Sequence, residues 1–207
     1  MNGKKVKIAV LVSGGGTNLQ ALIDAQKSGI IKSGEITLVL SNKADAYALT
    51  RAKNAGINTA AVLKSDYPDK AAFEEAVIKK LDDNGTDIIV LAGFMVILSE
   101  SFTNHFKNRI INIHPSLIPS FCGEGFYGLK VHKAALDYGV KVTGATVHFV
   151  NEIADGGEII MQKAVSVEEN DTPEILQKRV MEQAEWIILP KACEKVCKQI
   201  LESKESL

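Results

Sequence analysis

The sequence predicts an α/β fold in which an open, mostly parallel sheet is flanked by helices and has an antiparallel edge in its C-terminal half. Short apolar runs alternate with helical patterns through the first half of the chain, as strands and crossover helices do in a parallel sheet. A glycine-rich loop, Ser13 to Asn18, separates the first run from the first helical pattern. In the second half, two strands are joined by a turn containing Asp155-Gly156-Gly157, which favours antiparallel pairing. Together these features are typical of a Rossmann-like fold.

Each predicted element follows from its local pattern. Strands are expected at residues 7–12, 35–40, 58–63, 87–92, 109–114, 141–150 and 158–167. Helices are expected at residues 18–25, 44–55, 70–82 and 129–138 and from Pro173 onward. The run at 87–92 is apolar on both faces, which predicts the most central strand. Pro173 takes the first position of the last helix, and Pro190 is predicted to bend that helix.

Length and composition favour one domain and exclude several classes of partner. A chain of 207 residues with 46% hydrophobic side chains can bury one core, so we expect a single domain over residues 1–207. Lysine plus arginine total 24 against 25 acids, which argues against binding to nucleic acid or to an anionic membrane. No apolar run reaches the roughly 20 residues of a membrane span, and the N-terminus lacks a signal pattern, so we expect a cytoplasmic protein.

The three cysteines are Cys122, Cys193 and Cys197. An odd number of cysteines, with no histidine near the last two, is typical of structural thiols in a reducing compartment, and metal binding is a minor alternative. No pattern in the sequence fixes an oligomeric state.

The glycine loop, Ser13-Gly14-Gly15-Gly16-Thr17-Asn18, predicts an anion site. Backbone amides at the start of a helix, together with the helix dipole, favour negative charge, and glycines allow close approach. The dinucleotide motif fits poorly, because Leu19 replaces its third glycine and no acid follows the second strand. No Gly-Lys-Ser/Thr completes a P-loop. A single phosphate group is therefore the expected ligand of this loop, and a tight turn without a ligand is the alternative.

Asn112, His114 and Asp155 form the candidate catalytic set. Asn112 and His114 are two residues apart at the end of a strand, so their side chains leave the same face at the edge where open sheets carry chemistry. Asp155 lies in a glycine-rich turn and is the expected partner of His114. An amide donor, an imidazole and a carboxylate suit the attack of an amine on a carbonyl group. The alternative is a hydrogen-bonded structural histidine.

The remaining histidines are weaker candidates. His105 is expected on a helix face, His132 on the helix after a long loop, and His148 among apolar neighbours in a strand. Four scattered histidines predict no metal site, and no Gly-x-Ser-x-Gly elbow is present for a serine nucleophile.

The motifs resemble, in chain order, those of folate-dependent formyltransferases over nearly the whole sequence. The glycine loop indicates the branch of the family that acts on glycinamide ribonucleotide, the phosphoribosylglycinamide formyltransferases. The segments that carry the resemblance are Ser13 to Gln20, Ser41-Asn42-Lys43-Ala44-Asp45, Leu91-Ala92-Gly93-Phe94-Met95, Asn112 to Leu117 and Asp155-Gly156-Gly157. The resemblance implies transfer of the formyl group of 10-formyltetrahydrofolate, a cosubstrate, to the amine of glycinamide ribonucleotide in purine biosynthesis, without a metal.

The resemblance also implies residue roles. Asn112 and His114 would stabilise the tetrahedral intermediate, and Asp155 would tune His114 and relay protons. The substrate phosphate would be held by Gly16, Thr17 and Asn18, and its ribose or glycinamide end by Glu185. The folate would contact Lys70, Phe94, Met95, Val96, Ile97, Leu98, Asn112, Asn151, Glu152, Ile153, Ala154 and Asp155.

The sequence departs from the family pattern at three of the places to which the resemblance assigns roles or motifs. Val96 stands where arginine is frequent, the loop from Ser120 to Gly128 is longer than the common form, and Glu185 is followed by Trp186 where the family usually has histidine. For Lys70 and Glu185, solvated side chains are the structural alternative.

Three other functions compete with this interpretation. Formyltetrahydrofolate deformylase uses a similar set of residues but normally carries an additional N-terminal domain. Methionyl-tRNA formyltransferase is longer and needs a basic surface, which a net charge of −1 does not provide. A non-catalytic phosphosugar-binding module would use the glycine loop and leave His114 structural.

Overall fold

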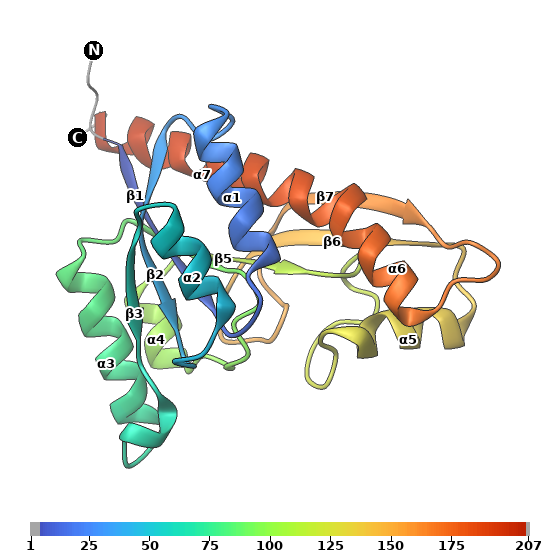
Figure 1. Ribbon diagram of the computed structural model, residues 1–207, viewed down its shortest axis with the longest axis horizontal. Coiled ribbons are helices and arrows are strands. Elements are labelled where there is room, and N and C mark those ends of the chain that lie inside the picture. The colour runs from blue at the N-terminus through green and yellow to red at the C-terminus, as the bar shows by residue number, and fades with distance from the viewer. Residues whose placement is uncertain (1–4, 206–207) are drawn as a thin grey trace.

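The computed structural model describes residues 5–205 and contains a seven-stranded sheet with the strand order β3-β2-β1-β4-β5-β6-β7 (Figure 1). The strands are β1 (Val6–Val12), β2 (Gly34–Ser41), β3 (Asn58–Ala61), β4 (Ile88–Leu91), β5 (Ile110–His114), β6 (Val142–Phe149) and β7 (Ile159–Ser166). β1 to β5 pair in parallel, whereas β6 and β7 pair antiparallel at one edge. The predicted fold class is confirmed.

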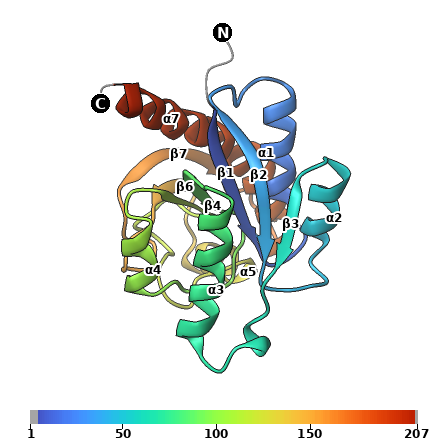
Figure 2. The same ribbon diagram turned by 90° about the vertical axis from the view of Figure 1, so that its left-hand side faces the viewer.

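Helices cover both faces of the sheet (Figure 2). The helices are α1 (Thr17–Lys27), α2 (Tyr47–Asn54), α3 (Lys70–Asp83), α4 (Glu100–His105), α5 (Leu129–Tyr138), α6 (Pro173–Val180) and α7 (Trp186–Glu205), with a 3-10 turn at Lys64–Asp66. Apolar residues of α1, α2, α6 and α7 join one buried cluster, and those of α3 and α4 join the other. Within residues 5–205, none of the helices has the length and apolarity needed to cross a bilayer.

The structure differs from the sequence prediction at two helices. No range was predicted for α4, because six residues are too few to show a helical period, although His105 was expected on a helix face. The Ser99 side chain caps α4 by accepting from the amide of Phe102. The last helix contains a π-helical turn, Met181–Glu185, in which the Trp186 amide donates to the Met181 carbonyl. The main irregularity therefore lies before Pro190, which sits inside α7.

The strand order places the loops after β1 and β4 next to each other. The order reverses between these two strands, and ligands of open α/β sheets bind at such a switch point. Ser13 connects the loops: its hydroxyl donates to Asn42 Oδ1 (2.6 Å) and accepts from the amide of Met95 (2.8 Å). The glycine loop and the 94–98 segment therefore share one edge of the sheet.

The cysteines differ in exposure. Cys193 and Cys197 are fully buried in α7, whereas Cys122 is half-buried in the loop after β5, and all three are free thiols. Among the described residues, no group of three or more histidine, cysteine or acidic side chains is arranged to hold a metal ion.

Candidate active site

The glycine loop turns sharply into α1. Gly16 has left-handed backbone angles, φ 74° and ψ 36°, and a Cβ built there would lie 2.6 Å from the Cβ of Ala48. Only glycine therefore allows α2 to pack this closely against the loop. Because α1 begins at Thr17, its first amides point out of the helix end beside the loop. The local geometry is that of an anion site.

The π-helical turn brings Glu185 to this loop. Glu185 is 6% exposed, and its Oε2 accepts from the Asn18 side-chain amide at 2.7 Å. Burial raises the pKa of Glu185 to about 7, and the hydrogen bond from Asn18 opposes this rise. Thr17 contacts the Met181 sulfur at 3.9 Å. Asn18 and Glu185, 167 residues apart, thus meet in one place.

Asn112, His114 and Asp155 lie together at the end of β5. His114 Nδ1 is 3.4 Å from Asp155 Oδ2, and Asn112 Nδ2 is 3.5 Å from Asp155 Oδ1. The His114 side chain is 5% exposed and that of Asp155 14%. The structure therefore brings together the three residues that the sequence predicted as neighbours, in a largely buried cluster.

His148 is a fourth member that the sequence analysis ranked as a weak candidate. It pairs with Asn112 across the antiparallel strands β5 and β6, and its Nε2 lies 3.2 Å from Asn112 Nδ2 and 3.5 Å from Asp155 Oδ1. Its Nδ1 lies 2.7 Å from the Phe149 carbonyl oxygen and donates to it, and Nε2 faces both Asn112 and Asp155. The only local signal was a histidine inside a strand; its partners depend on the pairing register.

The turn after β6 aims the Asp155 carboxylate at the cluster. Asp155 has a positive φ of 55°, a conformation that aspartate tolerates better than most residues. A Cβ at Gly157 would lie 1.8 Å from the Phe149 carbonyl oxygen, so the chain can close the turn only with glycine there. Asp155 Oδ2 also accepts from the Gly123 amide at 2.9 Å.

Burial and neighbouring charge act in opposite directions on His114. Burial lowers the pKa of His114, and the Asp155 carboxylate and the Phe121 carbonyl oppose this. Its Nε2 lies 2.9 Å from that carbonyl oxygen, which only accepts, so Nε2 carries a proton. Nδ1 faces the Asp155 carboxylate, so only the protonated ring, the imidazolium, can donate to both Phe121 and Asp155. Burial outweighs the two opposing groups, so the pKa of His114 lies below its ordinary value.

Asp155 remains ionised. Burial acts to raise the pKa of Asp155, but the hydrogen bond with His148, the charge of His114 and the Gly123 amide together hold it below the ordinary value. His132 on α5 is 1% exposed, and burial with the charge of His114 lowers the pKa of His132 to about 4. His132 is thus a neutral neighbour of the cluster.

Two loops beside the cluster expose apolar side chains. Met95, Ile97 and Ile153 are 54%, 63% and 61% exposed. Phe94, Val96 and Leu98, from the loop after β4, pack on one buried apolar cluster, and so does Val150, at the start of the loop after β6. The exposed apolar side chains of both loops therefore flank this cluster beside the Asp155 turn.

Lys70 stands close to this surface. Its Nζ lies 3.6 Å from Glu74 Oε1, and the side chain is 45% exposed. Glu74 is buried and accepts from the amide (2.9 Å) and the hydroxyl of Ser99, the residue after Leu98. Asn151 accepts from the Ile153 amide at 3.0 Å, whereas Glu152 and Ala154 are exposed.

The fold and the site together define an α/β protein with a glycine loop at the sheet switch point and an amide, imidazole and carboxylate cluster suited to acid–base chemistry. A family model described as "Formyl transferase" matches residues 6–193. The chain belongs to the formyl transferase family.

Relatives with named functions match most of the chain. The phosphoribosylglycinamide formyltransferase of Escherichia coli strain K12 is 43% identical over 86% of this chain and 81% of its own length. The trifunctional purine biosynthetic protein adenosine-3 of Bos taurus is 46% identical over 93% of this chain, which spans only 18% of that relative.

Solved structures show the same fold. Glycinamide ribonucleotide transformylase 1 from Symbiobacterium toebii has a TM-score of 0.89 and 42% identity, covering 96% of this chain and 90% of the other. Phosphoribosylglycinamide formyltransferase from Brucella melitensis has a TM-score of 0.86 and 42% identity, covering 94% and 96%.

Proposed function

We propose that this chain, as one formyltransferase domain, transfers the formyl group of 10-formyltetrahydrofolate to the amine of glycinamide ribonucleotide in purine biosynthesis. The products are formylglycinamide ribonucleotide and tetrahydrofolate. The observation that carries the proposal is the convergence of Asn112, His114 and Asp155 on the sheet edge that also bears the anion loop. The names of relatives more than 40% identical over most of both chains support it.

The ribonucleotide fits the side of the site formed by α1 and the π-helical turn. Gly16, Thr17 and Asn18 would hold the phosphate through loop amides and the start of α1. Glu185, fixed by Asn18, would accept a hydrogen bond from the ribose or the glycinamide. This placement leaves the substrate amine free to extend toward His114.

The folate fits the apolar surface next to Asp155. Its pteridine would lie against the 94–98 loop, Phe94 to Leu98, and the 151–155 loop, Asn151 to Asp155, whose peptide groups supply donors and acceptors. Lys70, half-exposed at the start of α3, would meet the anionic tail. Val96 makes this part of the site apolar where related enzymes often carry arginine.

Bound folate supplies an activated formyl group, and the residues of the chain handle charge and protons. As the amine forms a bond to the formyl carbon, negative charge develops on the formyl oxygen. The Asn112 amide and the His114 imidazolium would donate hydrogen bonds to this oxygen, and for this the His114 Nε2–H would leave the Phe121 carbonyl. Asp155 would stabilise the imidazolium and, through water, receive the amine proton, which then passes to the departing folate nitrogen as its bond to carbon breaks.

The absorbance change on conversion of 10-formyltetrahydrofolate to tetrahydrofolate tests the proposal directly. We expect turnover of the purified chain only when glycinamide ribonucleotide is present. Turnover without the ribonucleotide would assign a deformylase, and no turnover in either mixture would indicate a binding module.

The His114→Ala variant tests the catalytic role of the cluster. We expect a loss of at least about 100-fold in kcat, the lower end of the range for general acid–base groups. The matched control is His105→Ala, because His105 is an exposed histidine that pairs with Asp82 on the surface. Equal activity of the two variants would exclude His114 from the chemistry.

A further inference from the structure

Two groups of α2 donate hydrogen bonds to carbonyl oxygens of the glycine loop. The Ala48 amide donates to the Gly14 carbonyl at 3.0 Å, and Arg51 Nε donates to the Gly15 carbonyl at 2.8 Å. In a trans peptide, the carbonyl and the following N–H point in opposite directions. Turning these two carbonyls toward α2 therefore turns the amides of Gly15 and Gly16 away from it. A left-handed residue such as Gly16 is a feature of the backbone concavities that bind anions.

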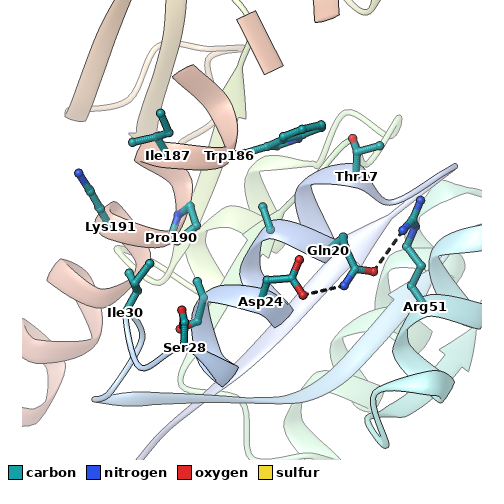
Figure 3. A pocket seen from close by; sticks show the side chains of 12 residues that line it. Thr17, Gln20, Asp24, Ser28, Ile30, Arg51, Trp186, Ile187, Pro190 and Lys191 are labelled. Carbon is teal, nitrogen blue, oxygen red and sulfur yellow. Dashed lines mark hydrogen bonds between the residues drawn. The ribbon is translucent and has the colours of Figure 1, made fainter. Parts of the chain in front are cut away.

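Arg51 is itself fixed by side chains of α1 (Figure 3). Its Nη1 donates to Gln20 Oε1 at 3.1 Å, and Gln20 Nε2 donates to Asp24 Oδ1 at 2.9 Å. The guanidinium lies 5.0 Å from the centre of the Tyr47 ring. One side chain thus ties α2, the loop and the first turn of α1 together.

The position of Arg51 also has an electrostatic consequence. Arg51 and Thr17 line the same cavity of about 540 Å³ between α1 and α7. The positive charge therefore lies beside the first turn of α1, and the charged side chains of Asp24 and Lys191 line the same cavity. Within residues 5–205, no other lysine or arginine side chain is hydrogen-bonded to the glycine loop, and the loop itself carries no charged side chain.

We propose that Arg51 is a positioning residue for the substrate phosphate: it fixes the Gly15–Gly16 peptide so that its amide binds the anion. The inference rests on the proposed function, in which this loop holds the ribonucleotide phosphate. Lysine cannot reproduce the role, because its single ammonium lacks the planar fork that reaches the Gly15 carbonyl and Gln20 together.

The test compares four variants in steady-state kinetics and in inhibition by inorganic phosphate. For Arg51→Met we expect KM for the ribonucleotide and Ki for inorganic phosphate to rise together, by about tenfold, the effect of one charge-assisted hydrogen bond. We expect little change in kcat or in KM for the folate, because the loop does not touch the reacting atoms. Arg51→Lys should keep most of the defect, and Gln20→Leu should show a smaller one.

Lys53→Met is the matched control, because it removes a positive charge from the exposed face of the same helix. Equal KM and Ki in Arg51→Met and Lys53→Met, or wild-type values in Arg51→Lys, would overturn the inference. A fall in kcat alone would overturn it as well. If Arg51→Met does not fold, Arg51→Lys and Gln20→Leu carry the test. Wild-type protein without ribonucleotide-dependent turnover would refute the proposed function instead, and calorimetric binding of inorganic phosphate would still test Arg51.

Discussion

Replacing Glu185 by glutamine should change how the stability of the protein depends on pH. In the folded chain, burial raises the pKa of Glu185 from 4.5 to about 7, so the carboxyl group keeps its proton where the unfolded chain has lost it. A raised pKa contributes stability that is fully present below pH 4.5 and is lost as pH rises to about 7. At 1.36 kcal/mol per pKa unit, the loss totals roughly 3 kcal/mol.

Glutamine removes this loss, because it stays neutral and its side-chain oxygen can still accept from Asn18. Urea unfolding at pH 5 and pH 8 measures the effect. We expect the free energy of unfolding of Glu185→Gln, relative to wild type, to rise by roughly 2–3 kcal/mol between the two pH values. Glu182→Gln, at an exposed site in the same π-helical turn, should show no such change. A pH-independent difference between Glu185→Gln and wild type would refute the reasoning.

Three further substitutions address the cluster. Asp155→Asn should lower kcat by roughly 10²–10⁴ and move the pH–rate limb of His114 to lower pH, because the carboxylate raises the pKa of His114; a pH–rate profile measures both. His148→Phe should lower kcat by roughly tenfold with little change in either KM, because Asp155 and Asn112 lose a partner; unchanged kcat would make His148 structural. Gly157→Ala should destabilise the protein by roughly 1–3 kcal/mol in urea unfolding, because the added carbon meets the Phe149 carbonyl, and wild-type stability would contradict the close approach.

The elements that the sequence predicted well have strong local signals. α5 begins and ends at the predicted residues, 129 and 138, because an amphipathic period lies between Gly128 and Gly139. The range of the six-residue α4 was not predicted beyond a helix at His105, because a short helix shows no period. The π-helical turn was missed, because a π turn follows from how a helix packs.

The sequence also placed Asn112 and His114 on one face of β5. Residues two apart in a strand share a face, so this prediction needed no tertiary contact. The glycine loop was equally readable as the turn from β1 into α1, because Gly14-Gly15-Gly16 separates the two local patterns.

Only the tertiary structure decided which distant groups meet. His148 joins Asn112 because β6 pairs antiparallel with β5 in one register, and a shift by one residue would turn its side chain to the other face. Glu185 reaches Asn18, and Arg51 reaches the glycine loop, through helices that pack on the same side of the sheet. Sequence patterns report the period of a segment and the chemistry of its residues. The partners of a buried polar group depend on contacts between segments that are far apart in the chain.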